Sequence, residues 1–161
     1  MSKVGARLKE LGLALPPPVQ VPPSVVLPFP WVNVRGDRAL ISGHGPQEPD
    51  GRLAGPFGAV GDQVSIEQGR EIARKVGLSM LGSLQRELGD LDRITGWYRV
   101  FGMVNCVHGF DKPPAVINGF SELILDVFGP EIGRHSRSAI GVAGLPFNFA
   151  VEVEAEVMIR H

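Results

Sequence analysis

The feature that most constrains the fold is a long apolar stripe at helical spacing between Ser65 and Gly89. Ser65 and Gln68 form a capping-box pattern, which marks the N-terminus of a helix. Apolar residues then recur at intervals near 3.6, at Ile72, Val76, Leu78, Leu81, Leu84 and Leu88. Gly77 and Gly82 interrupt this helix, and we expect them to mark a close approach to a sheet. A helix with one apolar face needs a second layer against which to bury it.

Strand patterns and a second helix supply that layer. The segment 113–133 has a second amphipathic pattern, with Pro114 suited to a first helical turn and Gly129-Pro130 expected to end the helix. We expect a hairpin over 31–43, turned at Gly36-Asp37, and a short strand near Leu53. Three more strands are expected at 93–107, 138–145 and 149–160.

This order of elements predicts an α+β fold, a two-layer sandwich with one sheet and two helices on one face. The strand at 93–107 is apolar on both faces, which suggests that another subunit covers the opposite face. The 161 residues fit a single domain. Within it, residues 1–24 form an N-terminal helix followed by a proline-rich extension, which we expect to lie on the domain.

Composition limits the classes of function. A net charge of −1 disfavours a general role in coating nucleic acid. The single cysteine, Cys106, excludes an intramolecular disulfide and is expected to be buried. No stretch approaches the ~18 apolar residues of a membrane span. The first residues, "MSKVGARLKELGLALPPP", lack the apolar core of a signal peptide, so we expect a cytoplasmic protein.

An arginine directly before an expected strand is the most informative polar feature. In "GRHSRSAIGVAG", Arg137 opens directly into an apolar run. Arg137 is either a solvated strand end or a desolvated guanidinium. A desolvated guanidinium needs an anion, which here is either a protein carboxylate, Glu152 or Glu154 on the partner strand, or the carboxylate of a ligand. By residue type alone, Glu152 fits a solvated strand face, His44 an exposed turn, and Asn118 a solvent-facing or helix-end position.

Several segments together resemble the RidA/YjgF superfamily, in the branch with a longer N-terminus. "RHSRSAIGVAGLP" with "VEVEAEV" resembles its C-terminal signature, and "GDRALISGHGP" and "GDLDRITGWYRVFGMVN" resemble earlier segments, so that residues 25–160 are covered. The resemblance implies a chorismate-mutase-like fold with one mixed sheet. It also implies a homotrimer with a central barrel and ligand clefts between subunits, and no metal or organic cofactor.

The resemblance also implies roles for individual residues. Arg137 matches the arginine that binds a substrate carboxylate, and Glu152 matches the glutamate that activates water. Gly43 matches a glycine whose backbone lies in the cleft, and Asn118 matches a helix asparagine of the cleft. Ala139 stands where many members have cysteine.

Two further positions depart from the family pattern. Phe29 or Trp31 replaces a cleft aromatic that is often tyrosine, and His44 replaces the usual glutamine. These departures do not change Arg137, the residue expected to bind a substrate carboxylate. They bear on the identity of the substrate.

The family activity implied is hydrolysis of 2-imino or 2-enamino acids to 2-keto acids and ammonia. Three alternatives stay open on the sequence. The trimer could bind a small carboxylate, as a signal or chaperone-like protein, without turnover. It could be an endoribonuclease or translation inhibitor, although the chain offers no basic-aromatic block for RNA. It could also deaminate a larger enamine, with the N-terminal extension reshaping the cleft.

Overall fold

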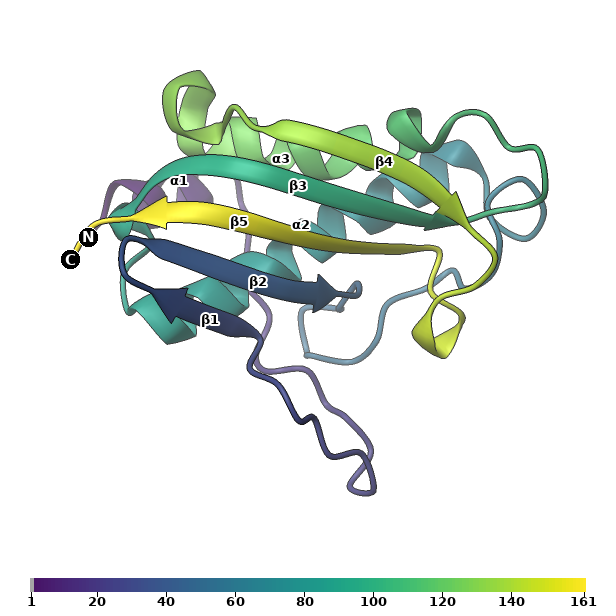
Figure 1. Ribbon diagram of the computed structural model, residues 1–161, viewed down its shortest axis with the longest axis horizontal. Helices are drawn as coiled ribbons and strands as arrows, with labels where there is room; N and C mark the ends of the chain where they lie inside the picture. Colours follow the sequence, from purple (N-terminus) through teal and green to yellow (C-terminus); the bar gives the residue numbers. More distant parts are fainter. Residues whose placement is uncertain (1) are drawn as a thin grey trace.

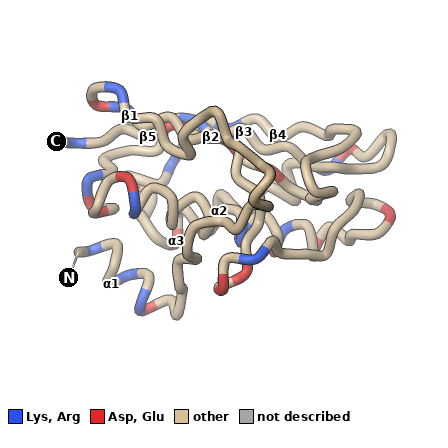
Figure 2. Tube along the Cα trace, turned by 90° about the horizontal axis from the view of Figure 1, so that it is seen from below, with Lys and Arg blue, Asp and Glu red and all other residues tan. Residues whose placement is uncertain are grey.

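A computed structural model describes residues 2–161 as a sheet with its long helices on one side (Figure 1). Seen edge-on, the sheet and the helices form two layers (Figure 2). The helices are α1 (Lys3–Glu10), α2 (Ile66–Leu88) and α3 (Pro113–Gly133), and the strands are β1 (Val32–Arg35), β2 (Arg38–His44), β3 (Ile94–Asn105), β4 (Ser136–Val142) and β5 (Val151–Ile159). Short 3-10 turns at Leu91–Arg93 and Pro146–Asn148 precede β3 and β5. The predicted α+β class is confirmed.

The sheet has five strands in the order β1-β2-β5-β3-β4. All neighbours are antiparallel except β3 and β4, which run parallel because α3 carries the chain back between them. The sheet is therefore mixed. β4 is an edge strand, and β3 separates it from β5. The expectation that Arg137 and Glu152 lie on partner strands is wrong, because the short turn between β4 and β5 spans an intervening strand.

Helices α2 and α3 pack on each other and on the sheet. The capping box of α2 is present, with Ser65 accepting from the Gln68 backbone and the Gln68 side chain accepting in return. Gly77 and Gly82 of α2 do not approach the sheet, contrary to expectation. A Cβ on Gly77 would lie 2.6 Å from Leu123 of α3, and one on Gly82 would lie 2.9 Å from the Pro16 carbonyl oxygen. These glycines instead admit the second helix and the N-terminal segment.

Two expected elements differ in the structure. Gly129 has a φ of +72° that breaks α3, yet the chain makes one more turn to Gly133 before β4 begins. This extra turn sets the position of the residues that lead into β4. The strand expected near Leu53 is only an isolated bridge to Gln47.

Cys106 is half-buried against the core and is not one of the fully buried residues.

The N-terminal extension lies on the domain only in part. Ser2 caps α1, and Val4 and Leu8 are buried beneath this helix. The chain then passes along α2, where the Pro16 carbonyl accepts from Arg86. Beyond this point a loop projects away from both layers (bottom of Figure 1), and its Val26 is 84% exposed. No helix within residues 2–161 is long and apolar enough to cross a membrane.

No part of residues 2–161 forms a layer over the second face of the sheet. On β5 the valines at 151, 153 and 157 are buried on the helix side, and the alternating glutamates at 152, 154 and 156 point to the other face. A groove with a volume of about 340 Å³ runs across this open face. Its lining includes Phe29, Leu40, Ser42, Arg99, Phe101 and Glu154.

Candidate functional site

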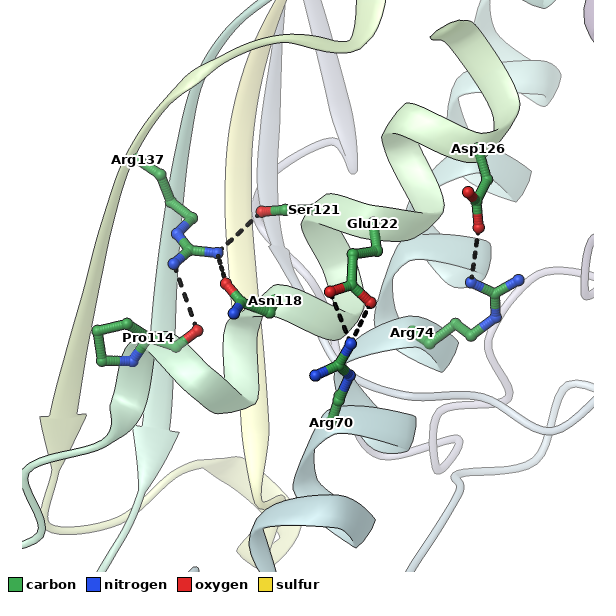
Figure 3. A network of polar contacts seen from close by, with 8 residues as sticks. All are labelled: Arg70, Arg74, Pro114, Asn118, Ser121, Glu122, Asp126 and Arg137. Atoms are coloured by element: carbon green, nitrogen blue, oxygen red, sulfur yellow. Dashed lines mark hydrogen bonds and ion pairs between the residues drawn. The ribbon is translucent and has the colours of Figure 1, made fainter. Parts of the chain in front are cut away.

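Arg137 is held by neutral acceptors on α3 (Figure 3). Its Nη1 donates to Asn118 Oδ1 at 2.9 Å and to Ser121 Oγ at 3.0 Å, and its Nη2 donates to the Pro114 carbonyl at 3.3 Å. Within residues 2–161 no carboxylate forms an ion pair with this guanidinium. The salt bridge from Arg137 to Glu152 or Glu154, one of the two interpretations of the sequence, is absent from the described chain.

The acidic residues nearest along α3 are occupied elsewhere. Glu122 pairs with Arg70 of α2, and Asp126 lies 3.5 Å from the Arg74 guanidinium (Figure 3). Partial burial lowers the pKa of Arg137, which nevertheless remains charged at any ordinary pH. The guanidinium is thus partly desolvated and held by three neutral acceptors, with no carboxylate partner among residues 2–161.

A shallow cavity of about 310 Å³ opens beside this guanidinium. It is lined by Asn118, Ser121, Leu125, Arg134, His135 and Arg137. Of these, sequence reasoning missed the contact of Ser121. The signal was available, because Ser121 follows Asn118 by three positions and therefore shares its face of the helix. Ala139 lies two residues beyond Arg137 on the same face of β4 and is partly buried against the core.

Gly43 and Glu152 lie together on the open face. An irregularity in the register between Ile41 and His44 lets β2 present Gly43 toward β5. A Cβ at Gly43 would collide with the Glu152 carboxylate, so that only glycine leaves room for this contact. Glu152 is half-buried, and burial, followed by the charge of Glu154, raises the pKa of Glu152. Glu154 is more exposed and lines the open-face groove.

The three remaining predicted site residues divide between the two faces. Phe29 is 45% exposed and lines the open-face groove. Trp31 turns away from that groove, and its ring centroid lies 4.9 Å from that of His44. The expectation of an exposed His44 is wrong, since its side chain is only 3% exposed and lies against α2. The apolar pocket beneath the projecting N-terminal loop contains both Trp31 and His44.

His44 is a buried neutral histidine with both ring nitrogens bonded. Nδ1–H donates to the Ser42 carbonyl at 2.7 Å, and Nε2 accepts from the Ser83 hydroxyl at 2.9 Å. Burial, the largest cause, lowers the pKa of His44 from 6.5 to about 4. The Ser42 hydrogen bond opposes this shift and the charge of Arg86 reinforces it.

This histidine should make the protein acid-sensitive. The unfolded chain takes up the proton near pH 6.5 and the folded chain only near 4, so stability falls as pH drops between these values. The free energy of unfolding should lose about 3 kcal/mol between pH 7 and pH 4 through His44. Urea unfolding at both pH values should show a smaller loss in H44Q. The same substitution at the exposed His108 should leave the loss unchanged, and equal losses in wild type and H44Q would contradict this role.

The predicted residues form two half-sites that one chain does not bring together. Arg137 is in register with Val100 and Glu152 with Met103, three residues further along β3. Strand spacing and rise place their Cα atoms about 14 Å apart, and the two side chains leave opposite faces of the sheet. Arg137, Asn118 and Ala139 lie together at the edge strand, as one candidate half-site, and Gly43 and Glu152 lie together on the open face, as the other candidate half-site.

The chain is similar to proteins of known sequence and structure along nearly its whole length. A family model described as "YjgF/chorismate mutase-like, putative endoribonuclease" matches residues 6–155. Protein TCP17 of Trypanosoma cruzi is 37% identical over 160 residues, covering 99% of this chain and 96% of that protein.

Solved structures share the fold. The structure of Atu1372 from Agrobacterium tumefaciens, described as of unknown function, is 35% identical with a TM-score of 0.84, covering 97% of this chain and 91% of that one. A Shewanella oneidensis protein described as "a putative endoribonuclease" is 27% identical with a TM-score of 0.85, covering 98% and 100%. Escherichia coli TdcF, solved with bound serine, is 18% identical with a TM-score of 0.58, covering 91% and 94%.

Proposed function

The chain belongs to the YjgF/chorismate mutase-like family, the RidA superfamily, and from this membership we propose that it hydrolyses small 2-imino or 2-enamino acids. The products are a 2-keto acid and ammonia. The observation that carries the proposal is the setting of Arg137, a partly desolvated guanidinium whose partners within residues 2–161 are all neutral acceptors. A small carboxylate, as in an amino-acid-derived imine, is the anion that suits this guanidinium, and TdcF, with its bound serine, offers a parallel from the same fold.

Hydrolysis of an imine requires little more than orientation and a base. The protonated C=N carbon is electrophilic, so a water about 3 Å away attacks it once the substrate is fixed. Glu152 takes one proton from that water, and the new C–O bond gives a carbinolamine. The nitrogen gains a proton and leaves as ammonia as the C=O bond forms. A raised pKa suits Glu152 to this exchange, because a base works best when its pKa approaches the working pH.

The complete site is proposed to form between identical subunits. Arg137 and Glu152 cannot reach one small substrate from the same chain, given their opposite faces of the sheet. A neighbour that packs its open face near the β4 edge of the first subunit would join the two half-sites. The exposed large apolar residues of the open face, among them Phe29, Leu40 and Ile140, favour such packing. We propose a closed ring of three subunits, with a cleft at each junction.

The activity is tested by generating 2-imino acids within the assay mixture. An amino-acid oxidase acting on alanine, leucine or glutamate releases the imine, and semicarbazide traps what survives. The protein should reduce trapped imine and increase the rate of 2-keto acid and ammonia formation above the spontaneous rate. Saturable binding of 2-oxobutanoate without any acceleration would contradict turnover and leave a carboxylate-binding protein.

Cleavage of RNA fits the surface less well. Lys and Arg alternate with Asp and Glu along the trace, without gathering in one basic stripe (Figure 2). The net charge of −1 likewise disfavours binding to the phosphate backbone of RNA.

Alanine at position 43 should impair activity without unfolding the protein. Its Cβ would push the Glu152 carboxylate aside, and that flexible side chain can move away. A displaced base should lower kcat/KM by about 10-fold to 100-fold, with a melting temperature close to wild type. G96A is the matched control, since a Cβ at Gly96 meets nothing within 4 Å. Full activity in G43A would show that the contact between Gly43 and Glu152 has no catalytic consequence.

A further inference from the structure

A histidine lies beside the arginine half-site and lines the same cavity. His135 precedes β4 and is half-buried beside Trp97, with ring centroids 6.4 Å apart. Its Nδ1 lies 2.7 Å from the Gly133 carbonyl oxygen, and its Nε2 lies 3.0 Å from Ser121 Oγ. Ser121 is the residue that also accepts from Arg137 Nη1. These contacts form one chain of hydrogen bonds from Gly133 to the guanidinium.

The chemistry of these groups fixes the direction of every hydrogen bond. A carbonyl oxygen only accepts, so Nδ1 of His135 carries the proton that is donated to Gly133. In a neutral imidazole Nε2 is then an acceptor, and the Ser121 hydroxyl donates to it. The lone pairs of Ser121 are left facing Arg137, which only donates. Burial, the largest cause, lowers the pKa of His135; the Gly133 hydrogen bond opposes this shift and the charge of Arg137 reinforces it, so that the net shift favours the neutral ring.

We propose that His135 is a positioning residue of the carboxylate site: by accepting the Ser121 hydroxyl proton it turns the Ser121 oxygen toward Arg137 and fixes the plane of the guanidinium. Without this acceptor the Ser121 hydroxyl rotates freely, and its proton can point toward the guanidinium. Arg137 then keeps Asn118 and Pro114 as partners and samples more orientations. A bidentate grip on a carboxylate needs one fixed orientation of the fork.

The extra turn of α3 past Gly129 makes this arrangement feasible. This turn brings the Gly133 carbonyl within hydrogen-bond distance of the His135 ring. The hydrogen bond holds the ring of His135, the residue before β4, in a fixed orientation. The histidine lines the cavity but holds no part of the ligand carboxylate in this scheme. Its effect reaches the ligand through Ser121 and Arg137, and it should therefore appear in binding more than in the chemical step.

The inference rests on the proposed function only in taking a carboxylate as the ligand of Arg137, so its test measures binding directly. Isothermal titration with 2-oxobutanoate should give a dissociation constant about 5-fold to 10-fold weaker in H135F and in S121A than in wild type. The double variant should be no weaker than S121A alone, because both changes break the same link. H135Q, whose amide oxygen can accept from Ser121, should bind within about 2-fold of wild type. H108F, at an exposed histidine, is the matched control.

Several outcomes would overturn the inference. These are wild-type affinity in S121A or H135F, additive losses in the double variant, an H135Q as weak as H135F, or no binding of 2-oxobutanoate to the wild type. If H135F fails to fold, S121A and H135Q decide. A wild type that binds 2-oxobutanoate but accelerates no imine hydrolysis contradicts the deaminase proposal alone, and the affinities of the variants still test His135. Where turnover occurs, KM should rise in S121A while kcat changes little.

Discussion

Replacing Arg137 by lysine should lower kcat/KM for a 2-imino acid roughly 1,000-fold, corresponding to about 4 kcal/mol of lost transition-state binding. Lysine keeps the charge and loses the fork. Its three donors would be shared among Asn118, Ser121 and the Pro114 carbonyl, which now bind the guanidinium, leaving none aligned for a carboxylate.

The measurement for R137K is steady-state imine hydrolysis together with the affinity for 2-oxobutanoate, both of which should fall. R70K is the matched control, because Arg70 pairs with Glu122 on the helices outside the half-site (Figure 3). Its activity should stay within about 2-fold of wild type. Turnover by R137K near the wild-type rate would remove Arg137 from the site.

Replacing Glu152 by glutamine should cost roughly 1,000-fold in kcat, within the range expected for the loss of a general base. Glutamine keeps the size of the side chain and cannot take a proton from water. Binding of 2-oxobutanoate should change little, because the carboxylate of the ligand is held by Arg137. The pair of measurements therefore separates the base from the anchor.

The pH profile identifies which glutamate is the base. The pKa of Glu152 is raised by burial and by Glu154, so the active carboxylate form is lost as pH falls through that raised value. In E154Q the repulsion between the two carboxylates disappears, and the acid limb of kcat should move to lower pH while the plateau rate is retained. An E154Q that is inactive beside an active E152Q would assign the base to Glu154.

Local chemistry made most elements of the fold predictable. The capping box at Ser65 and the glycine turn at Gly36 each depend on neighbouring residues, and both appear as expected. Strand order depends on long-range pairing that the sequence pattern does not encode. The insertion of β3 between β4 and β5 was therefore missed, and with it the separation of Arg137 from Glu152.

The candidate site was predictable in its residue types more than in its geometry. Asn118 was assigned with Arg137 from the family resemblance, and the structure places the two in hydrogen-bond contact. The burial of His44 was missed because a Gly-His-Gly segment suggests a turn, whereas β2 continues to His44 and aims the ring at Ser83. The part played by His135 depends on the turn past Gly129, which the sequence suggested would end the helix.

Mixing two inactive variants tests the central claim most directly. R137K and E152Q each lack one half-site, so unfolding and refolding them together at equal amounts gives rings in which some junctions combine an intact Arg137 with an intact Glu152. Random assembly should restore about one quarter of the wild-type activity, since each half-site is intact in half of the subunits. A mixture no more active than its two components would contradict a cleft shared between subunits.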